Sequence, residues 1–241
     1  MSKDDKNQLY SHYVRFHLPG SIKERVEVRA SYLRRLINIH FPERLDAKIL
    51  EIGCGHSALI YYARKMGCNQ LEGIDASLEQ VEEAWKLDLR DNIRKEDLME
   101  TLSKSADKTY NSIVAFDVIE HMTKSELLDL VEELHRVLCS GGKLILHMPN
   151  AAPPFFGRVR YGDYTHEQAF TQSSLSQLLI AHGFSEVQCF EDMLIVHGAK
   201  SAVRWVVWKV VRSIFRFALI AETGAKNEIF TQNFLAVTAK D

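Results

Sequence analysis

The 241-residue chain is predicted to form an α/β domain built on a doubly wound, mostly parallel β-sheet. Short apolar runs of strand length alternate with longer segments whose apolar residues recur every three or four positions, the period of an amphipathic helix. Strands connected through helices lie parallel, because each helix carries the chain back to the starting end of the sheet, and such crossovers are right-handed. Ligands bind such sheets beyond the carboxyl ends of the strands, so the residues that follow each strand are the first candidates for a functional site.

Residues 1–45 are expected to form a helical cap that precedes the sheet. Their clearest helical stretch is SIKERVEVRASYLRRLINIHF, residues 21–41, which is amphipathic and which Pro42 terminates. The remaining residues, 46–241, are assigned to one domain with a helical insertion at 198–227.

Strands and helices alternate through this domain. Strands are expected at AKILEIG (47–53), NQLEGID (69–75), IRKED (93–97), TYNSIVAFDVI (109–119), KLILHMP (143–149), FSEVQCFE (184–191) and EIFTQNFLAVTAK (228–240). Helices are expected at SALIYYARKMG (57–67), SLEQVEEAWKLD (77–88), TKSELLDLVEELHRVLCSGG (123–142) and TQSSLSQLLIAHG (171–183). Ser77 is a suitable N-cap for the second of these helices, and a glycine pair is expected to stop the third.

The composition is that of an ordinary soluble globular protein, with 46% hydrophobic and 26% charged residues. The formal net charge of −2 gives no indication of a general nucleic-acid-binding protein. The four cysteines are scattered and form no CxxC pair, which argues against a disulfide framework or a zinc site and fits a reducing compartment. Because the first residues lack the apolar stretch of a signal peptide, a cytoplasmic location is expected.

A glycine loop follows the first strand. LEIGCGHSA places Gly53 and Gly55 where a buried strand turns into a helix, and glycines there let a ligand approach the backbone. Twenty residues after Gly55, Asp75 ends the second strand, where its carboxylate is placed to accept hydrogen bonds from ribose hydroxyls. The pattern GCGHSA alone also fits a nicotinamide dinucleotide.

Three further features favour a different cofactor. Glu51 precedes the first glycine by two residues, FDVIEHM follows the fourth strand, and VLCSGGKLILHMPN leads into and forms the fifth. Together these resemble the class I S-adenosylmethionine-dependent methyltransferases, from about residue 45 to residue 195. The resemblance implies a Rossmann-like, seven-stranded sheet whose last strand is antiparallel.

The resemblance also implies a cofactor site for S-adenosylmethionine. Glu51, Gly53, Cys54 and Gly55 would surround the methionine part, Asp75 and Ala76 the ribose, and Asp97 and Leu98 the adenine, with Asp117 and Val118 near the cofactor after the fourth strand. The cofactor carries a sulfonium cation and an ammonium group but no phosphate. An acidic lining suits those charges and would repel a pyrophosphate.

Two histidines are the candidate catalytic bases, since a hydroxyl acceptor must lose a proton during methyl transfer. His121 lies in DVIEHM and His166 in GDYTHE. His121 alternatively orients the Asp117 loop, and His166 alternatively caps or packs the next helix. A phosphate or carboxylate acceptor would need only arginines for positioning. No metal is expected, because the spacing of Asp117, Glu120 and His121 is not diagnostic.

The stretch GRVRYGDYTHEQAFT, residues 157–171, resembles a subgroup with the pattern GD-aromatic-TH-E…FT that is often associated with bacterial surface-polysaccharide biosynthesis, of O-antigen or capsule. The resemblance implies that this loop covers the acceptor pocket. Asn150, Arg158, Arg160, Tyr161, Tyr164 and Asp163 would then face the acceptor. Asp163 either orients the His166 imidazole or contacts a sugar hydroxyl. The expected acceptor is a sugar, a lipid-linked glycan precursor or another small molecule, such as a quinone precursor; a non-catalytic scaffold protein is the alternative from another class.

The insertion contains AVRWVVWKVVRSIFRFALI, residues 202–220, with fourteen apolar residues out of nineteen. On a helix, Lys209, Arg212 and Arg216 share one face with Trp205, and the opposite side carries Val203, Val206, Val207, Val210, Ile214 and Phe217. Four cations argue against a transmembrane helix. Three alternatives remain open: peripheral contact with a membrane surface, a lid over the substrate pocket, or a homodimer contact. The stretch is too apolar to bind a nucleic-acid backbone.

Overall fold

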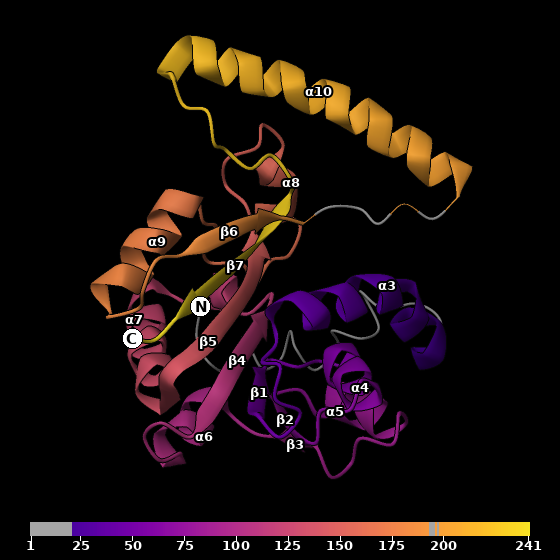
Figure 1. Ribbon diagram of the computed structural model, residues 1–241, viewed down its shortest axis with the longest axis vertical. Helices are drawn as coiled ribbons and strands as arrows, with labels where there is room; N and C mark the ends of the chain where they lie inside the picture. Colours follow the sequence, from indigo (N-terminus) through magenta and orange to yellow (C-terminus); the bar gives the residue numbers. More distant parts are fainter. Residues whose placement is uncertain (1–20, 193–195, 197) are drawn as a thin grey trace.

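The structure, a computed structural model, describes residues 21–192, 196 and 198–241. Its centre is a seven-stranded sheet in the order β3-β2-β1-β4-β5-β7-β6 (Figure 1). All pairings up to β5 are parallel, whereas β7 lies antiparallel between β5 and β6. This confirms the predicted fold class, including the antiparallel last strand.

The strands lie close to their predicted positions. They are β1 (Lys48–Ile52), β2 (Gln70–Asp75), β3 (Ile93–Lys95), β4 (Tyr110–Phe116), β5 (Leu138–Pro149), β6 (Gln188–Glu191) and β7 (Asn233–Ala239). The helices are α3 (Ile22–His40), α4 (Ala58–Lys65), α5 (Leu78–Trp85), α6 (Leu98–Lys104), the short 3₁₀ helix η1 (Ile119–His121), α7 (Lys124–Val137), α8 (Phe156–Arg160), α9 (Gln172–Ala181) and α10 (Ala199–Thr223).

Helices cover both faces of the sheet (Figure 1). Buried leucines of α6, α7 and α9 form one core, which includes Ile113 of β4. Residues of α3, α4 and α5 form the other core, which includes Val114, the next residue of β4. Neighbouring β4 residues thus alternate between two apolar layers, which explains why the strand is apolar throughout.

Helix α3 is the described part of the predicted N-terminal cap. It begins after Ser21, whose side chain accepts a hydrogen bond from the Glu24 N–H while the Glu24 carboxylate accepts one from the Ser21 N–H. Its buried face, which includes Val26 and Leu33, joins the same core as α4 and α5. Residues 1–20 of the predicted cap lie outside the described residues.

One helix end differs from its prediction. Helix α7 ends at Val137, four residues before the glycine pair that was expected to stop it. Leu138 is already extended, its N–H bonds the Leu134 carbonyl, and the chain continues directly into β5. The glycines therefore lie within β5, next to an irregularity in its pairing with β4.

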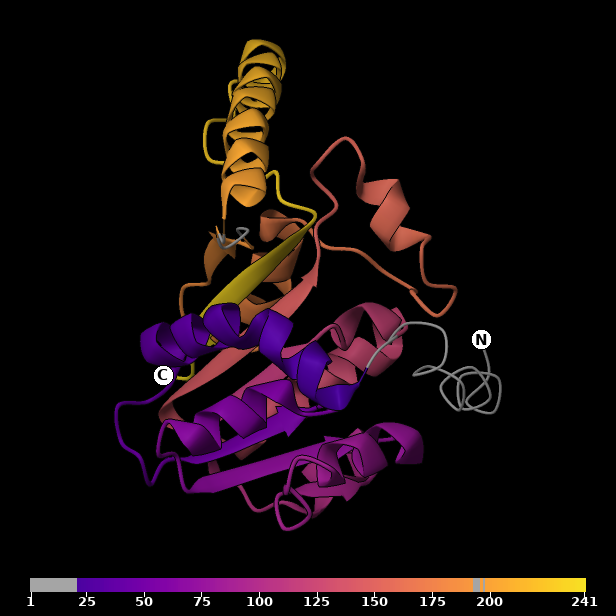
Figure 2. The ribbon, with the colours of Figure 1, turned by 90° about the vertical axis from the view of Figure 1, so that its right-hand side faces the viewer.

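Helix α10 forms the predicted insertion between β6 and β7, and it lies apart from both cores (Figures 1 and 2). Arg212 forms an ion pair with Glu191 of β6, and the Phe215 ring lies near the rings of Phe155 and Phe230. The opposite side is apolar and 53% to 74% exposed, at Val203, Val206, Val207, Val210, Ile214 and Phe217. The arginine side thus faces the domain and the apolar side faces outward. Among the described residues, no helix has the length and apolarity to cross a membrane.

Candidate active site

A cavity of about 290 Å³ opens beyond the carboxyl ends of β1, β2 and β4. Nine of the ten residues predicted to bind the cofactor line it: Glu51, Gly53, Cys54, Gly55, Asp75, Ala76, Leu98, Asp117 and Val118. Helix α3 adds Arg29 and Leu33 to the wall, and α5 adds Gln80. Nothing in the sequence pattern of α3 indicated that it reaches this site.

Asp97 does not lie where it was predicted. Its carboxylate accepts hydrogen bonds from the Met99 and Glu100 N–H groups and thereby caps α6. The cavity wall instead carries Glu96, the preceding residue. Strand β3 is only three residues long, so the turn into α6 decides which acid faces the cavity.

The glycine loop packs closely against Val118, and the predicted approach of a ligand to its backbone stays a prediction. Gly53 has a φ of +59°, and a Cβ placed on it would lie 2.5 Å from Val118 Cγ2. The Asp75 carboxylate accepts hydrogen bonds from the N–H groups of Gly55 and Ser77, each at 2.8 Å. Asp75 therefore fixes the loop after β1 against the end of β2.

Two buried side chains of the cavity wall each carry an oxygen atom that has no hydrogen-bond donor among the described residues. Glu51 Oε2 and Gln80 Oε1 accept no hydrogen bond from any described residue. Burial raises the pKa of Glu51 to about 8. Unsatisfied buried acceptors are costly, so the wall suits a ligand that brings hydrogen-bond donors, such as an ammonium group or hydroxyls.

A charge network centred on the buried His147 connects to the cavity wall at Asp117. His147 of β5 contacts Asp117 through Nδ1, at 2.7 Å, and Asp192 through Nε2, at 3.3 Å. Burial alone would lower the pKa of His147, but the two carboxylates raise it to about 10. The imidazolium thus links the end of β4 to the residue that follows β6. Because His147 lies inside an apolar strand, no motif indicated this role.

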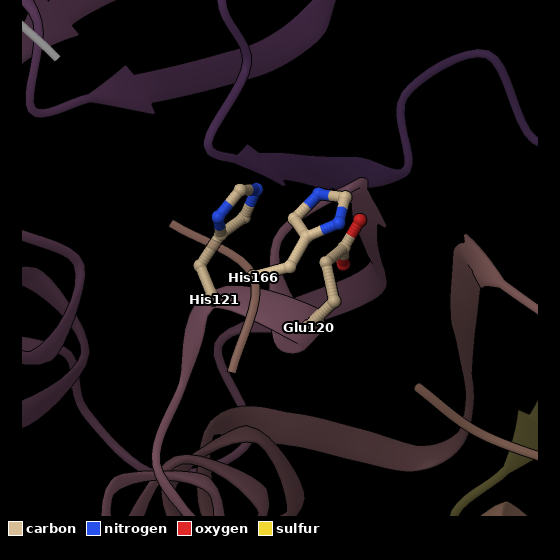
Figure 3. A group of neighbouring side chains, drawn as sticks. All are labelled: Glu120, His121 and His166. Atoms are coloured by element: carbon tan, nitrogen blue, oxygen red, sulfur yellow. The ribbon is translucent and has the colours of Figure 1, made fainter. Parts of the chain in front are cut away.

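The two predicted catalytic histidines lie together. The ring centroids of His121 and His166 are 4.8 Å apart, and Glu120 lies beside them (Figure 3). His121 also lines the cavity. The loop of residues 157–171 is held there because the N–H groups of Glu167 and Gln168 donate to the Glu120 carbonyl. Histidines 45 positions apart in the sequence therefore meet beside the predicted cofactor site.

The partners of these histidines differ from the prediction. The Asp163 carboxylate accepts hydrogen bonds from the N–H and the hydroxyl of Thr165, and the same hydroxyl contacts His121 Nδ1 at 2.8 Å. His166 Nδ1 lies 3.0 Å from the Val159 carbonyl oxygen. Asp163 thus orients His121 through Thr165, and a backbone carbonyl, not Asp163, orients His166.

Two predicted acceptor-binding residues have structural roles. Asn150 is buried, and its amide bonds the carbonyls of Ile229 and Thr231 and the N–H of Ala152. The Arg160 guanidinium donates to the backbone carbonyls at the end of its own loop, 6 and 7 positions further on. Arg158, Tyr161 and Tyr164 lie exposed at the surface of that loop. They stay available for an acceptor but lie outside the described cavity wall.

Residues 24–188, about two thirds of the chain, match the family model described as a methyltransferase domain. The chain belongs to the methyltransferase-domain family. Two ubiquinone biosynthesis O-methyltransferases from Rickettsia bellii, of strains OSU 85-389 and RML369-C, are 27% identical to it over 110 residues. These matches cover 44% of this chain and 45% of each relative, so the chain spans less than half the length of the curated relatives it matches.

Solved methyltransferase structures share the fold at low sequence identity. A SAM-dependent methyltransferase from Archaeoglobus fulgidus has a TM-score of 0.68 at 19% identity and covers 96% of this chain and 98% of its own. A possible histamine N-methyltransferase from Thermotoga maritima has a TM-score of 0.63 at 14% identity and covers 98% of both chains. Phosphoethanolamine N-methyltransferase 2 from Haemonchus contortus, solved with S-adenosyl-L-methionine, reaches 0.60 at 13% identity over 87% of this chain and 52% of its own.

Proposed function

We propose that this methyltransferase-family protein transfers the methyl group of S-adenosylmethionine to a hydroxyl oxygen of a small acceptor. The observation that carries the proposal is the juxtaposition of His121 and His166 beside the cavity that follows β1, β2 and β4. The methyltransferase-family match and the fold shared with SAM-dependent methyltransferases support the reaction class.

The residues of the cavity fit this cofactor. The unsatisfied Glu51 Oε2 would accept a hydrogen bond from the amino-acid ammonium group, and Asp75 would accept from the ribose hydroxyls. Leu98 offers an apolar surface to the adenine ring. Asp75 and Asp117 would compensate the positive charge of the sulfonium group, and the bound ammonium group would favour the ionised form of Glu51. When bound, S-adenosylmethionine supplies an electrophilic methyl group.

His166 is the proposed general base for the acceptor hydroxyl. Burial and the neighbouring His166 lower the pKa of His121 to about 4, so His121 is neutral at pH 7 and holds a proton only weakly. His166 is less buried and lies on the loop that carries the other acceptor-facing candidates, Arg158, Tyr161 and Tyr164. His121, held by Thr165, would position the acceptor between the base and the methyl group.

Single-turnover assays test this assignment. His166→Ala is expected to slow methyl transfer about 100-fold or more, and His121→Ala by less, with cofactor affinity retained. If both variants keep the wild-type single-turnover rate, neither histidine is the base. If the protein binds S-adenosylmethionine in calorimetry but yields no S-adenosylhomocysteine with any acceptor, the non-catalytic scaffold is the correct description.

The acceptor is proposed to be a sugar or a lipid-linked surface-glycan precursor. The loop pattern of residues 157–171 supports this class, and the exposed Tyr161 and Tyr164 rings suit stacking on the apolar face of a sugar. A second candidate is a hydroxylated quinone precursor, which the similarity to the ubiquinone biosynthesis O-methyltransferases of Rickettsia bellii favours. Parallel turnover assays with nucleotide sugars, undecaprenyl-linked sugars and dihydroxybenzoates would distinguish the two.

Helix α10 is proposed to rest on the cytoplasmic face of a membrane through residues 202–220. Its outward side presents six large apolar residues, more than a helix exposed to water usually carries, and Lys200 and Arg204 flank this side. The lid alternative lacks this support, because the apolar side points away from the domain. The homodimer alternative uses the same surface.

Co-sedimentation with vesicles containing phosphatidylglycerol tests this contact. Val210→Glu should abolish binding, whereas Val28→Glu, which charges a valine 84% exposed on α3, should leave binding unchanged. Binding that is equal for both variants would contradict the proposal. A wild-type dimer in sedimentation velocity that Val210→Glu dissociates would assign the surface to a second copy instead.

A further inference from the structure

Glu120 is the most unusual acid in the described chain, because it is fully buried and its carboxylate is left unused. Its exposed fraction is 0%, and neither Oε1 nor Oε2 accepts a hydrogen bond from any described residue. A buried carboxylate without donors costs several kcal/mol, so such groups in folded proteins are paired or coordinate a metal. Its backbone carbonyl accepts two hydrogen bonds from the loop that carries His166.

Two imidazole rings border this carboxylate. One ligand atom each from Glu120, His121 and His166 lies within 4.8 Å of the other two. Figure 3 shows the Glu120 carboxylate beside the His166 ring, with the His121 ring next to it. A cation held at about 2.1 Å from each ligand needs ligand separations of about 3 to 4 Å, so the three groups would have to draw together on binding.

Hydrogen bonds fix which nitrogen each ring presents. The Asp163 carboxylate only accepts, so the Thr165 hydroxyl donates to it, at 2.6 Å, and must accept from His121 Nδ1–H. The Val159 carbonyl likewise accepts from His166 Nδ1–H. In neutral rings, each Nε2 therefore carries the lone pair. Metal-binding histidines are oriented in this way, through a hydrogen bond from the other ring nitrogen to a carbonyl or carboxylate system.

We propose that Glu120, His121 and His166 form a binding site for a divalent transition-metal ion. Two imidazole nitrogens and one carboxylate suit Mn²⁺, Co²⁺ or Zn²⁺ better than Mg²⁺ or Ca²⁺, which prefer oxygen ligands. The ion would satisfy both free oxygens of Glu120. It would also offset the negative charge that Asp117 and Asp163 add nearby.

The ion would change the roles of the histidines. Three protein ligands leave coordination positions open, and His121 lies at the boundary between the cluster and the cavity. An acceptor hydroxyl bound at an open position would lose its proton more readily, as metal-bound water does. With the ion bound, activation of the acceptor hydroxyl by the metal is the alternative to His166 as general base, and activity after chelator treatment separates the two. This role rests on the proposed methyl transfer, whereas the binding of the ion does not.

Titration of the chelator-treated protein with Co²⁺, followed by visible absorption, tests the site. Co²⁺ bound by nitrogen and oxygen lacks the intense sulfur charge-transfer absorption of a cysteine site, so the spectrum also reports which ligands hold the ion. The wild type should bind one equivalent. Glu120→Gln and His166→Ala should bind at least tenfold more weakly, and Glu132→Gln, which changes an exposed acid of α7, should match the wild type. Far-UV circular dichroism and S-adenosylmethionine affinity check that each variant is folded.

Three results would decide whether the ion binds and whether it acts in catalysis. Equal Co²⁺ binding by the wild type and both site variants, or no binding at all, overturns the proposal. Full methyl transfer by chelator-treated protein overturns the catalytic role of the ion. One tight Co²⁺ that depends on Glu120 supports the site, even if no acceptor is ever methylated, in which case only the proposed function fails.

Discussion

Replacing His147 with glutamine is predicted to destabilise the protein and to change how its stability depends on pH. The His147 side chain is 4% exposed and contacts Asp117 and Asp192 through its two ring nitrogens. Glutamine is similar in length but uncharged, so the variant leaves two carboxylates without their shared cation. Removing one partner of a buried ion pair costs about 3–5 kcal/mol.

The proton on His147 determines the pH dependence. Burial would lower its pKa, but the two carboxylates raise it from 6.5 to about 10. That shift is worth about 5 kcal/mol at about 1.36 kcal/mol per unit. Because the folded pKa exceeds the unfolded one, this stabilisation is complete below pH 6.5 and is lost as the pH rises through about 10. The wild-type advantage should therefore shrink by about 2.5 kcal/mol between pH 7 and pH 9.

Urea unfolding, followed by far-UV circular dichroism at pH 7, 8 and 9, measures this advantage. The matched control is His135→Gln, whose ring packs against Phe184. Burial lowers the pKa of His135, so that histidine is neutral above pH 7 in both states and its loss should cost the same at every pH. A wild-type advantage over His147→Gln that stays constant from pH 7 to pH 9 would show that folded His147 is neutral and refute the reasoning.

The remaining predictions concern three other sites. Gly53→Ala places a Cβ 2.5 Å from Val118 Cγ2 at a φ of +59° and should lower the free energy of unfolding by about 2–4 kcal/mol. Gly141 has a similar φ of +71°, but no atom lies within 4 Å of its Cβ position. Gly141→Ala should therefore lower the free energy of unfolding by only about 1–2 kcal/mol. Glu51→Gln should weaken S-adenosylmethionine binding about 10- to 100-fold in calorimetry. Arg136→Met should cost about 2–4 kcal/mol in urea unfolding, because its guanidinium bonds two carbonyls at the end of α6 and two carboxylates.

Each of these has a clear contrary outcome. Equal losses in the two glycine variants would mean that the contact with Val118 does not limit the Gly53 position. Unchanged cofactor affinity in Glu51→Gln would remove Glu51 from the proposed site. If Arg136→Met leaves the free energy of unfolding unchanged, water replaces the hydrogen bonds of the guanidinium at no cost.

Much of the cofactor cavity could be predicted because its residues sit at strand ends. The carboxyl ends of parallel strands meet at one edge, so the positions of Glu51, Gly53, Asp75 and Asp117 follow once the strands are recognised. The choice between Asp97 and Glu96 did not follow, since it depends on the geometry of a single turn after β3.

Residues that act through tertiary pairing left no local signal. His147 looks like one more member of an apolar strand until β5 is paired with β4 and β7 and Asp192, the residue after β6, reaches its ring. In the sequence Glu120 is an acid expected in a loop. Its burial depends on tertiary structure, because residues 157–171 return to η1 and bond its carbonyl. Asn150 follows a strand end as a ligand-binding residue would, yet its NH₂ group donates to two carbonyls just before β7 and its oxygen accepts from the Ala152 N–H.

The residues on either side of the helical insertion, at the end of β6 and the start of β7, lie close together. The Asp192 N–H donates to Thr231 Oγ1 at 3.3 Å, across the antiparallel pair β6 and β7. A segment whose ends already touch can be shortened, lengthened or exchanged without moving any strand, because closing a shorter loop there costs little entropy. The catalytic edge of the sheet lies at the ends of other strands. The proposed membrane contact and the proposed methyl-transfer site therefore lie in separate parts of the chain, so the sequence of one can change while the other stays fixed.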